Sequence, residues 1–342
     1  MPVIDADSHV VETERTWTFM PDEQEEYRPA VLARKSGRTR ASEYWLIDDR
    51  VFAKNANIGQ DTPEAAREAA DIAKRVAHMD ELGVDVHVLY PSLFLRPLTK
   101  RVEVDTALCR SYNRWLASIW RQVPERLRWV VIPPMGDREK ALEEIHFGKE
   151  HGACGVFVRA FEDDQRISDP YFFPLYAAAQ ALNLPVCIHA STGNFDHFEL
   201  FFTDSGFSTF KLSVVGTFHD LLLKRVPAKF PDLRWAFIEV SAQWLPYAMN
   251  DLSLRFGKRG EPFLSKAALK ENRMYVACQT SDDLDLILER VGDENIVIGT
   301  DYGHNDTASE LHALRKLRQG GAIGAATANK ILWENPKRLY GL

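Results

Sequence analysis

The stretch VIDADSH, residues 3–9, begins as a short apolar run and ends in two polar groups, Asp7 and His9. Side chains alternate between the two faces of a β-strand, so residues two apart point to the same side. If residues 3–7 form a strand, a carboxylate and an imidazole can enter one cavity together. Both groups are common metal ligands, so the pair becomes informative if further ligands follow at equivalent places.

Short apolar runs like the first recur seven times along the chain, with helical patterns between them. Such runs are typical of parallel strands covered on both faces, and their alternation with helices predicts a parallel sheet wrapped by helices. The strands are expected at residues 3–7, 86–90, 129–132, 155–159, 185–189, 235–240, 274–278 and 296–300.

Eight strand–helix units in 342 residues predict an α/β protein with a single (β/α)8 (TIM) barrel over residues 1–342. An insertion after the first strand is expected at about residues 12–60, with a small hairpin formed by residues 44–47 and 51–53. A doubly wound open sheet is the alternative, but the chain lacks the Gly-rich phosphate turn that usually follows an early strand there.

The intervening segments read as helices. Thr62 and Pro63 favour the start of one helix and Gly83 favours its end. Further helices are expected at residues 103–122, 137–150, 170–182, 207–225, 243–255, 281–291, 307–317 and about 323–334.

The composition is that of a globular protein, with 45% hydrophobic and 27% charged residues and a net charge of −7. Interspersed acids and bases argue against nucleic acid or an anionic membrane as partner and leave a small molecule as the expected one. The chain opens on a strand pattern without a basic and apolar leader, so we expect a cytoplasmic protein. The four cysteines are far apart and are expected to be buried thiols rather than a disulfide framework.

The ends of the expected strands carry the chemistry, because the active site of such a barrel forms where its strands end. Five strands end in ionisable residues: Asp7 and His9, then Arg159, His189, Glu239 and Asp301. Alone, His189 would be a core histidine and Asp301 a turn residue. Together, Asp7, His9, His189 and Asp301 predict a site for one divalent metal, and zinc, manganese and iron all suit two imidazoles with two carboxylates.

Seven segments extend this pattern over nearly the whole chain: DADSHVVE (5–12), MDELGVD (79–85), LYPS (89–92), DPYFFPLY (169–176), LPVCIH (184–189), FPDLR (230–234) and GTDYGH (299–304). Their order and spacing resemble the amidohydrolase superfamily, in the branch of aminocarboxymuconate-semialdehyde decarboxylase and the resorcylate-type decarboxylases. The resemblance implies a metal-dependent barrel whose ligands fall on the same four residues. It also implies a hydrolase or a non-oxidative decarboxylase, a lyase, acting on a small carboxylated substrate that is aromatic or derived from ring cleavage.

Two positions depart from the pattern that the resemblance implies. Many relatives open with His-x-His or Glu-x-His, where this chain has Asp7 and His9. Decarboxylase-type relatives place a catalytic histidine at the end of strand six, where this chain has Glu239. We expect Glu239, Asp301 and His304 to carry the acid–base chemistry, with zinc as the first choice of metal and manganese or iron as alternatives.

A second interpretation depends on Glu12, Glu239 and His304. Glu12 is either a solvated surface acid or an inward ligand. If all three turn inward, Glu12 and Glu239 would help to hold a second metal. Some members that resemble this family use a dinuclear iron or manganese site for oxygenase chemistry, which is the alternative function.

Arg159 is expected to orient a substrate carboxylate, because a guanidinium matches that group well; its other interpretation is a salt bridge to Glu162. Trp17, Phe19, Met20 and the loop around His197 are expected to close the site or to form a subunit contact. We expect a homodimer or a dimer-based oligomer, with a hetero-oligomer with a paralogue as the alternative. A non-catalytic barrel subunit is the third class, and the intact ligand set argues against it.

Overall fold

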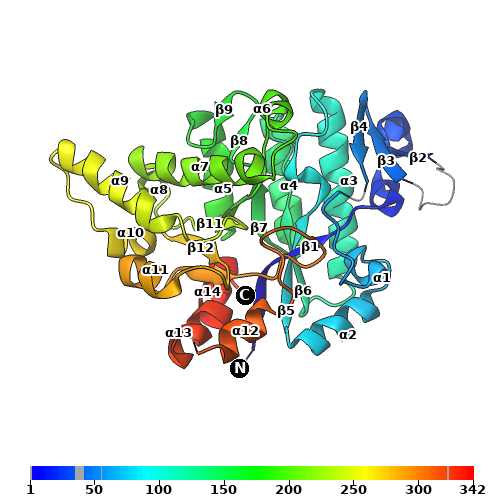
Figure 1. Ribbon diagram of the computed structural model, residues 1–342. Helices are drawn as coiled ribbons and strands as arrows, with labels where there is room; N and C mark the ends of the chain where they lie inside the picture. Colours follow the sequence, from blue (N-terminus) through cyan, green and yellow to red (C-terminus); the bar gives the residue numbers. More distant parts are fainter. Residues whose placement is uncertain (1, 35–41, 55, 322) are drawn as a thin grey trace.

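The computed structural model describes residues 2–34, 42–54, 56–321 and 323–342. Its centre is an eight-stranded parallel sheet that curls into a nearly closed barrel (Figure 1). All eight expected strands are present, and the predicted barrel is confirmed. In sheet order, which is also chain order, they are β1 (Ile4–Val10), β5 (Val86–Pro91), β6 (Leu127–Val131), β7 (Ala153–Val158), β10 (Val186–His189), β11 (Trp235–Ile238), β12 (Met274–Cys278) and β13 (Ile296–Ile298).

The first and last strands meet just beyond the end of β13. The backbone N–H of Asp301 donates to the carbonyl of Asp7 at 3.0 Å, and the N–H of His9 donates to the carbonyl of Tyr302 at 2.8 Å. A Cβ atom on Gly299 would lie 2.3 Å from the Cβ of Asp7. The two segments can therefore approach this closely only with glycine at position 299.

A buried carboxylate, that of Asp5, ties these two segments together. It accepts hydrogen bonds from the Thr300 N–H at 3.0 Å, the Thr300 hydroxyl at 2.5 Å and the Asp7 N–H at 3.2 Å. Burial raises the pKa of Asp5 to about 7, although the bonds from Thr300 lower it. Asp5 thus positions the backbone beside both Asp7 and Asp301.

Helices cover the outside of the barrel (Figure 1). They are α1 (Glu64–Arg67), α2 (Ile72–Leu82), α3 (Val102–Trp120), α4 (Arg138–Glu150), α5 (Phe173–Ala181), α6 (Phe195–Leu200), α7 (Leu212–Leu223), α8 (Val226–Lys229), α9 (Leu245–Lys258), α10 (Ser265–Glu271), α11 (Leu284–Val291), α12 (Ala313–Gln319), α13 (Ala325–Asn329) and α14 (Asn335–Tyr340). Short 3-10 segments are η1 (Glu14–Phe19), η2 (Asp22–Tyr27), η3 (Leu93–Leu95) and η4 (Pro170–Phe172), and π segments are η5 (Phe207–Lys211) and η6 (Lys330–Glu334).

The helix expected from Pro63 to Gly83 is two helices, α1 and α2, which corrects the prediction. Ala69 has a positive φ of 50°, and Asp71 caps α2 by accepting from the N–H of Lys74. Gly83 ends α2 in the left-handed conformation, as expected. The sequence pattern missed α6 and α10 and read the final helix, α14, as a tail.

The insertion after β1 forms an antiparallel sheet of three strands, β2 (Ala30–Arg34), β3 (Ser42–Ile47) and β4 (Arg50–Ala53). The expected hairpin is β3–β4, and β2 was missed. The insertion is anchored by buried tryptophans: Trp17 meets Trp45 edge to face, with ring centroids 6.0 Å apart. The Ser111 hydroxyl on α3 also donates to the carbonyl of Thr16 at 2.7 Å. A further short hairpin, β8 (Phe161–Glu162) with β9 (Gln165–Arg166), follows β7.

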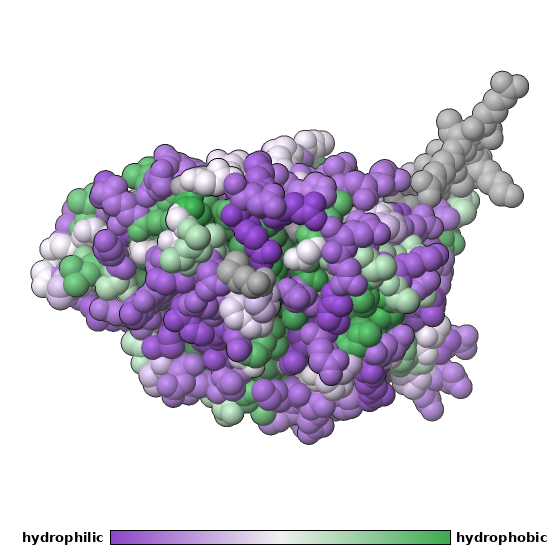
Figure 2. Space-filling view, turned by 90° about the horizontal axis from the view of Figure 1, so that it is seen from below, coloured by the Kyte–Doolittle hydropathy of each residue, from purple (hydrophilic) through white to green (hydrophobic). Residues whose placement is uncertain are grey.

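The cysteines are free and buried, as expected, at positions Cys109, Cys154, Cys187 and Cys278. The face of the molecule in Figure 2 is mainly hydrophilic, with hydrophobic residues scattered among polar ones. Over the part of the chain that the structure describes, no helix has both the length and the apolar character needed to cross a bilayer.

We expect Asp5→Ala to lower the free energy of unfolding by about 3 kcal/mol, because three buried donors lose their acceptor and each such loss costs about 1–3 kcal/mol. Urea unfolding followed by circular dichroism measures the change. Asp49→Ala is the matched control: its side chain is 83% exposed, and its effect should stay below about 0.5 kcal/mol. An unchanged unfolding midpoint in Asp5→Ala would contradict the anchoring role.

Candidate metal centre

Ionisable side chains from four strand ends converge inside the barrel. Asp7 and His9 lie on β1, His189 ends β10, Glu239 follows β11 and Asp301 follows β13. One ligand atom from each of Asp7, His9, His189 and Glu239 lies within 4.8 Å of the others. The same holds for a second group, which is His9, Glu239, Asp301 and His304. All six residues are buried, and the two groups share His9 and Glu239.

His9 lies at the centre of this cluster. Its Nε2 is 3.3 Å from Asp7 Oδ1, 3.1 Å from Asp301 Oδ1 and 3.9 Å from Glu239 Oε2. The ring of His189 contacts the same oxygen, with Nε2 3.2 Å from Asp7 Oδ1, and its centroid lies 5.0 Å from that of His9. The structure therefore brings the four predicted ligands together. Asp301 and His189 belong to different ligand groups, and His9 is a member of both.

His9 directs its Nε2 into the cluster, toward Asp7 and Asp301. Its Nδ1 lies 2.8 Å from the carbonyl of Pro91, an acceptor only, so we assign the proton to Nδ1. Several buried atoms here have no hydrogen-bond partner: His9 Nε2, Glu239 Oε2, Asp301 Oδ1 and His304 Nδ1. Buried polar atoms are nearly always paired, and each of these belongs to an imidazole or a carboxyl group, the groups that ligate metals. The donor set therefore fits a divalent cation, which would satisfy them together.

The electrostatics of the cluster follow from burial and from mutual charge. Burial lowers the pKa of His9, but the carboxylates of Asp301 and Asp7 raise it more strongly, to about 10. Burial opposes ionisation of Asp301 as well, yet His304 and His9 hold its pKa far below the usual value. Burial and the charge of Asp301 raise the pKa of Glu239 well above the usual value. Without a cation, burial and mutual charge therefore favour the ionised form of Asp301 and the protonated form of Glu239.

Two of these residues occupy strained backbone. Glu239 and Asp301 have φ angles of 65° and 53°, in the left-handed region that residues other than glycine rarely adopt. Such conformations cost about 1–3 kcal/mol each and persist where the surrounding structure imposes them, commonly at functional sites. Both carboxyl groups lie close to His9 Nε2 in this conformation.

His304 is held by a serine from the end of β5. Its Nε2 lies 2.9 Å from Ser92 Oγ, whose hydroxyl donates to the carbonyl of Val10 at 2.8 Å. Ser92 Oγ therefore accepts from Nε2, and Nδ1 lies 2.8 Å from Asp301 Oδ1. The ring also stacks on His9, with centroids 3.7 Å apart. Ser92 and Asp5 were not singled out from the sequence, although Ser92 directly follows a strand.

Glu12 is buried, but it lies outside both ligand groups. Its carboxylate accepts from the backbone N–H groups of Ser92 at 3.2 Å and Leu93 at 3.0 Å. Burial raises its pKa to about 7, against these bonds. Glu12 thus fixes the backbone turn at Ser92, and Ser92 in turn contacts His304.

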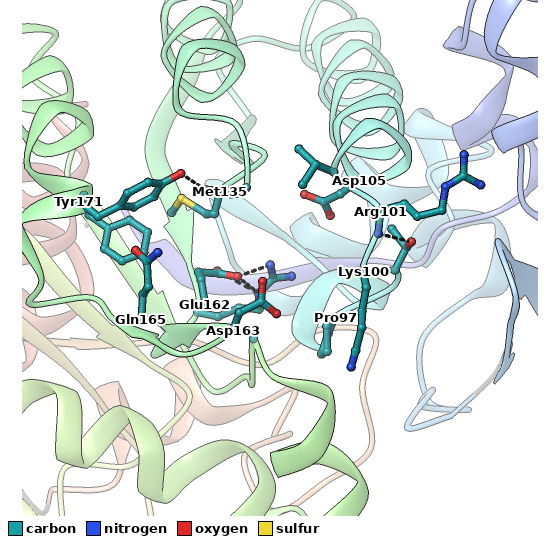
Figure 3. A pocket seen from close by; sticks show the side chains of 15 residues that line it. Pro97, Lys100, Arg101, Asp105, Met135, Glu162, Asp163, Gln165 and Tyr171 are labelled. Carbon is teal, nitrogen blue, oxygen red and sulfur yellow. Dashed lines mark hydrogen bonds and ion pairs between the residues drawn. The ribbon is translucent and has the colours of Figure 1, made fainter.

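Arg159 lines a cavity of about 240 Å³ beside the loop that follows β5, and none of the cluster residues borders this cavity. Figure 3 shows three acids around it, Asp105, Glu162 and Asp163. The Nε of Arg159 lies 3.0 Å from both oxygens of Glu162, and its Nη2 lies 2.5 Å from one of them. The salt bridge, the second interpretation of Arg159, is therefore present, and a substrate carboxylate would have to compete with Glu162.

The fold and the cluster together define a metal-dependent enzyme built on a (β/α)8 barrel. The sequence model of the amidohydrolase family matches residues 4–342, so the chain belongs to this family. The resemblance to the amidohydrolase superfamily identified in the sequence is thereby confirmed.

Solved structures share this fold at low sequence identity. An amidohydrolase from Mycobacterium avium subsp. paratuberculosis K-10 has a TM-score of 0.81 at 19% identity, over 99% of each chain. The manganese-bound 5-carboxyvanillate decarboxylase from Novosphingobium aromaticivorans has a TM-score of 0.66 at 21% identity, over 79% of this chain and 80% of its own. A 2,6-dihydroxybenzoate decarboxylase complexed with 2,6-dihydroxybenzoate has a TM-score of 0.69 at 16% identity, over the whole of both chains.

We expect His189→Ala to weaken metal binding by more than about 100-fold, since loss of even an outer-shell partner typically costs 10–100-fold. Titration of metal-free protein with Zn²⁺ and with Mn²⁺ measures the affinity. His146→Ala, which removes an exposed histidine on α4, is the control and should bind as the unmodified protein does. Equal affinity in both variants would exclude His189 as a ligand.

Proposed function

We propose that the chain is a metal-dependent, non-oxidative decarboxylase of a small carboxylated substrate, aromatic or derived from ring cleavage. Hydrolysis at the same centre is the other reaction of the family that this site can support. The observation that carries the proposal is the set of buried ligand atoms without partners, which includes an oxygen of Glu239. Two decarboxylases of aromatic carboxylates with the same fold support it.

The cation would be held by Asp7, His9, His189 and Asp301. When bound, it supplies a Lewis acid that attracts the oxygens of the substrate and spreads the charge that develops on it. Zinc was the first choice from the sequence. The share of carboxylate ligands suits manganese equally, and a decarboxylase of this fold binds manganese.

Glu239 supplies the proton in this scheme. As the bond between the ring carbon and the carboxylate breaks, carbon dioxide leaves and the electron pair stays on the ring carbon. Glu239 donates its proton to that carbon, becomes a carboxylate and regains a proton from water. Burial and the charge of Asp301 raise the pKa of Glu239, which favours the protonated form that a general acid needs. Asp301, with its lowered pKa, stays ionised and would be the base in hydrolysis.

A dinuclear iron or manganese oxygenase is the second candidate function. The second ligand group favours it, because His304 directs an unpartnered Nδ1 toward Asp301 and Glu239. Glu239 would then be a ligand rather than an acid. Glu12 is the other expected ligand of a second metal. Its two carboxylate oxygens accept hydrogen bonds from the backbone N–H groups of Ser92 and Leu93 instead.

We expect Glu239→Gln to bind metal normally and to lower kcat by about 10²–10⁴-fold, the range typical for loss of a general acid or base. The assay is carbon dioxide release from a panel of hydroxybenzoates by metal-loaded protein. Glu289→Gln, an exposed change on α11, should retain full activity. Full activity in Glu239→Gln would refute its role as proton donor.

The two candidate functions differ in metal count. For the decarboxylase we expect about one metal per chain, turnover without oxygen and loss of activity on chelation that added Mn²⁺ or Zn²⁺ restores. Two iron or manganese ions per chain with substrate-dependent oxygen consumption would favour the oxygenase. Elemental analysis of protein purified without added metal, with an oxygen electrode, distinguishes them.

A further inference from the structure

The two carboxylate oxygens of Asp301 have different surroundings. Oδ1 faces the cluster, 3.1 Å from His9 Nε2 and 2.8 Å from His304 Nδ1. Oδ2 accepts a hydrogen bond from the hydroxyl of Ser309 at 2.5 Å. Within the described residues, this hydroxyl is the only hydrogen-bond donor to Oδ2. One oxygen is therefore engaged from outside the cluster, and the other is left for a cation.

A second hydrogen bond fixes the direction in which Ser309 donates. The backbone N–H of Asp306 donates to the oxygen of Ser309 at 3.0 Å. A backbone N–H only donates, an ionised carboxylate only accepts, and a hydroxyl has a single proton. The proton of Ser309 is therefore directed at Asp301. Such a bond to a charged acceptor is roughly twice as strong as one between neutral groups.

The loop that carries Ser309 is anchored to two other parts of the molecule. The side chain of Asp306 accepts from the amide of Asn57 in the insertion, at 2.8 Å. Lys211, the last residue of η5, donates to the hydroxyl of Thr307 at 3.0 Å. The hydroxyl of Ser309 thus belongs to a loop that is attached both to the insertion and to the segment after β10.

A fixed partner matters for this carboxylate in particular. Asp301 has a φ angle of 53°, and the terminal torsion of an aspartate side chain has only broad preferences. The residue itself therefore does not select which of its oxygens faces His9. The hydrogen bond from Ser309 to Oδ2 supplies that selection.

We propose that Ser309 is a positioning residue of the metal centre, which holds Asp301 by Oδ2 so that Oδ1 stays directed at the bound cation. The inference rests on the metal centre of the proposed function and goes beyond it, because Ser309 lies outside both ligand groups. Hydrogen-bond partners of metal ligands orient those ligands, and their loss typically costs about 10–100-fold in metal affinity.

Titration of metal-free protein with Co²⁺, followed by visible absorption, tests the proposal, because the absorption bands of Co²⁺ depend on the number and geometry of its ligands. Ser309→Ala should bind Co²⁺ about tenfold or more weakly and should shift these bands. Ser309→Thr, which keeps a hydroxyl, should recover both the affinity and the spectrum. Ser281→Ala removes an exposed hydroxyl from the loop after β12, and this matched control should bind as the unmodified protein does.

A second control separates the hydroxyl from the general order of the loop. Asn57→Ala removes an anchor of Asp306 but leaves Ser309 in place, so it should weaken Co²⁺ binding less than Ser309→Ala does. An equal loss in both variants would assign the effect to the loop and overturn the proposal. Unchanged Co²⁺ affinity and spectrum in Ser309→Ala, folded by circular dichroism, would overturn it too. The same conclusion follows if Ser309→Thr binds no better than Ser309→Ala.

The outcomes separate this inference from the proposed function. If the unmodified protein binds Co²⁺ but releases no carbon dioxide from the hydroxybenzoates, the decarboxylase proposal fails, and the comparison of Ser309 variants still decides the inference. If the unmodified protein is a decarboxylase and Ser309→Ala matches its Co²⁺ affinity and spectrum, the inference alone fails. If the unmodified protein binds neither Co²⁺ nor Mn²⁺, both fail.

Discussion

The crowding of electron-pair donors around His9 is the constraint on which the site depends. Three carboxylates and three imidazoles meet in a buried space, and several of their atoms have no partner within the protein. Burying these groups without a cation costs folding free energy, so interactions elsewhere in the fold must keep them in place. The backbone closure between β1 and the segment after β13, the Asp5 carboxylate and the strained φ of Glu239 and Asp301 do this together.

Much of the fold could be predicted from the sequence, because parallel strands covered on both faces are apolar runs that helices separate. The same regularity locates the strand ends, and it selected the residues that meet at the centre. Contacts between loops do not follow from such a pattern. The sequence left the pairing of Arg159 with Glu162 as one of two open interpretations, and only the structure shows that the two side chains meet.

Glu12 shows why a residue type and a position do not determine a role. The sequence left it as a surface acid or a metal ligand. In the structure it is buried, and its oxygens accept the N–H groups that begin η3. This turn carries Ser92, which fixes the proton of His304, so Glu12 acts on the centre through two intermediates. A local turn of this kind depends on exact backbone geometry, which apolar periodicity does not encode.

Glu239 links the number of cations to the kind of reaction. Burial and the charge of Asp301 favour its protonated form. Glu239 belongs to both ligand groups, so any cation that contacts its carboxyl group would reverse this balance, since a nearby positive charge favours the carboxylate. Glu239 would then become a ligand and could no longer donate a proton. The role of Glu239 therefore depends on whether a bound cation contacts its carboxyl group: an uncoordinated Glu239 is consistent with an acid that protonates carbon, and a coordinated one with a carboxylate that holds metal.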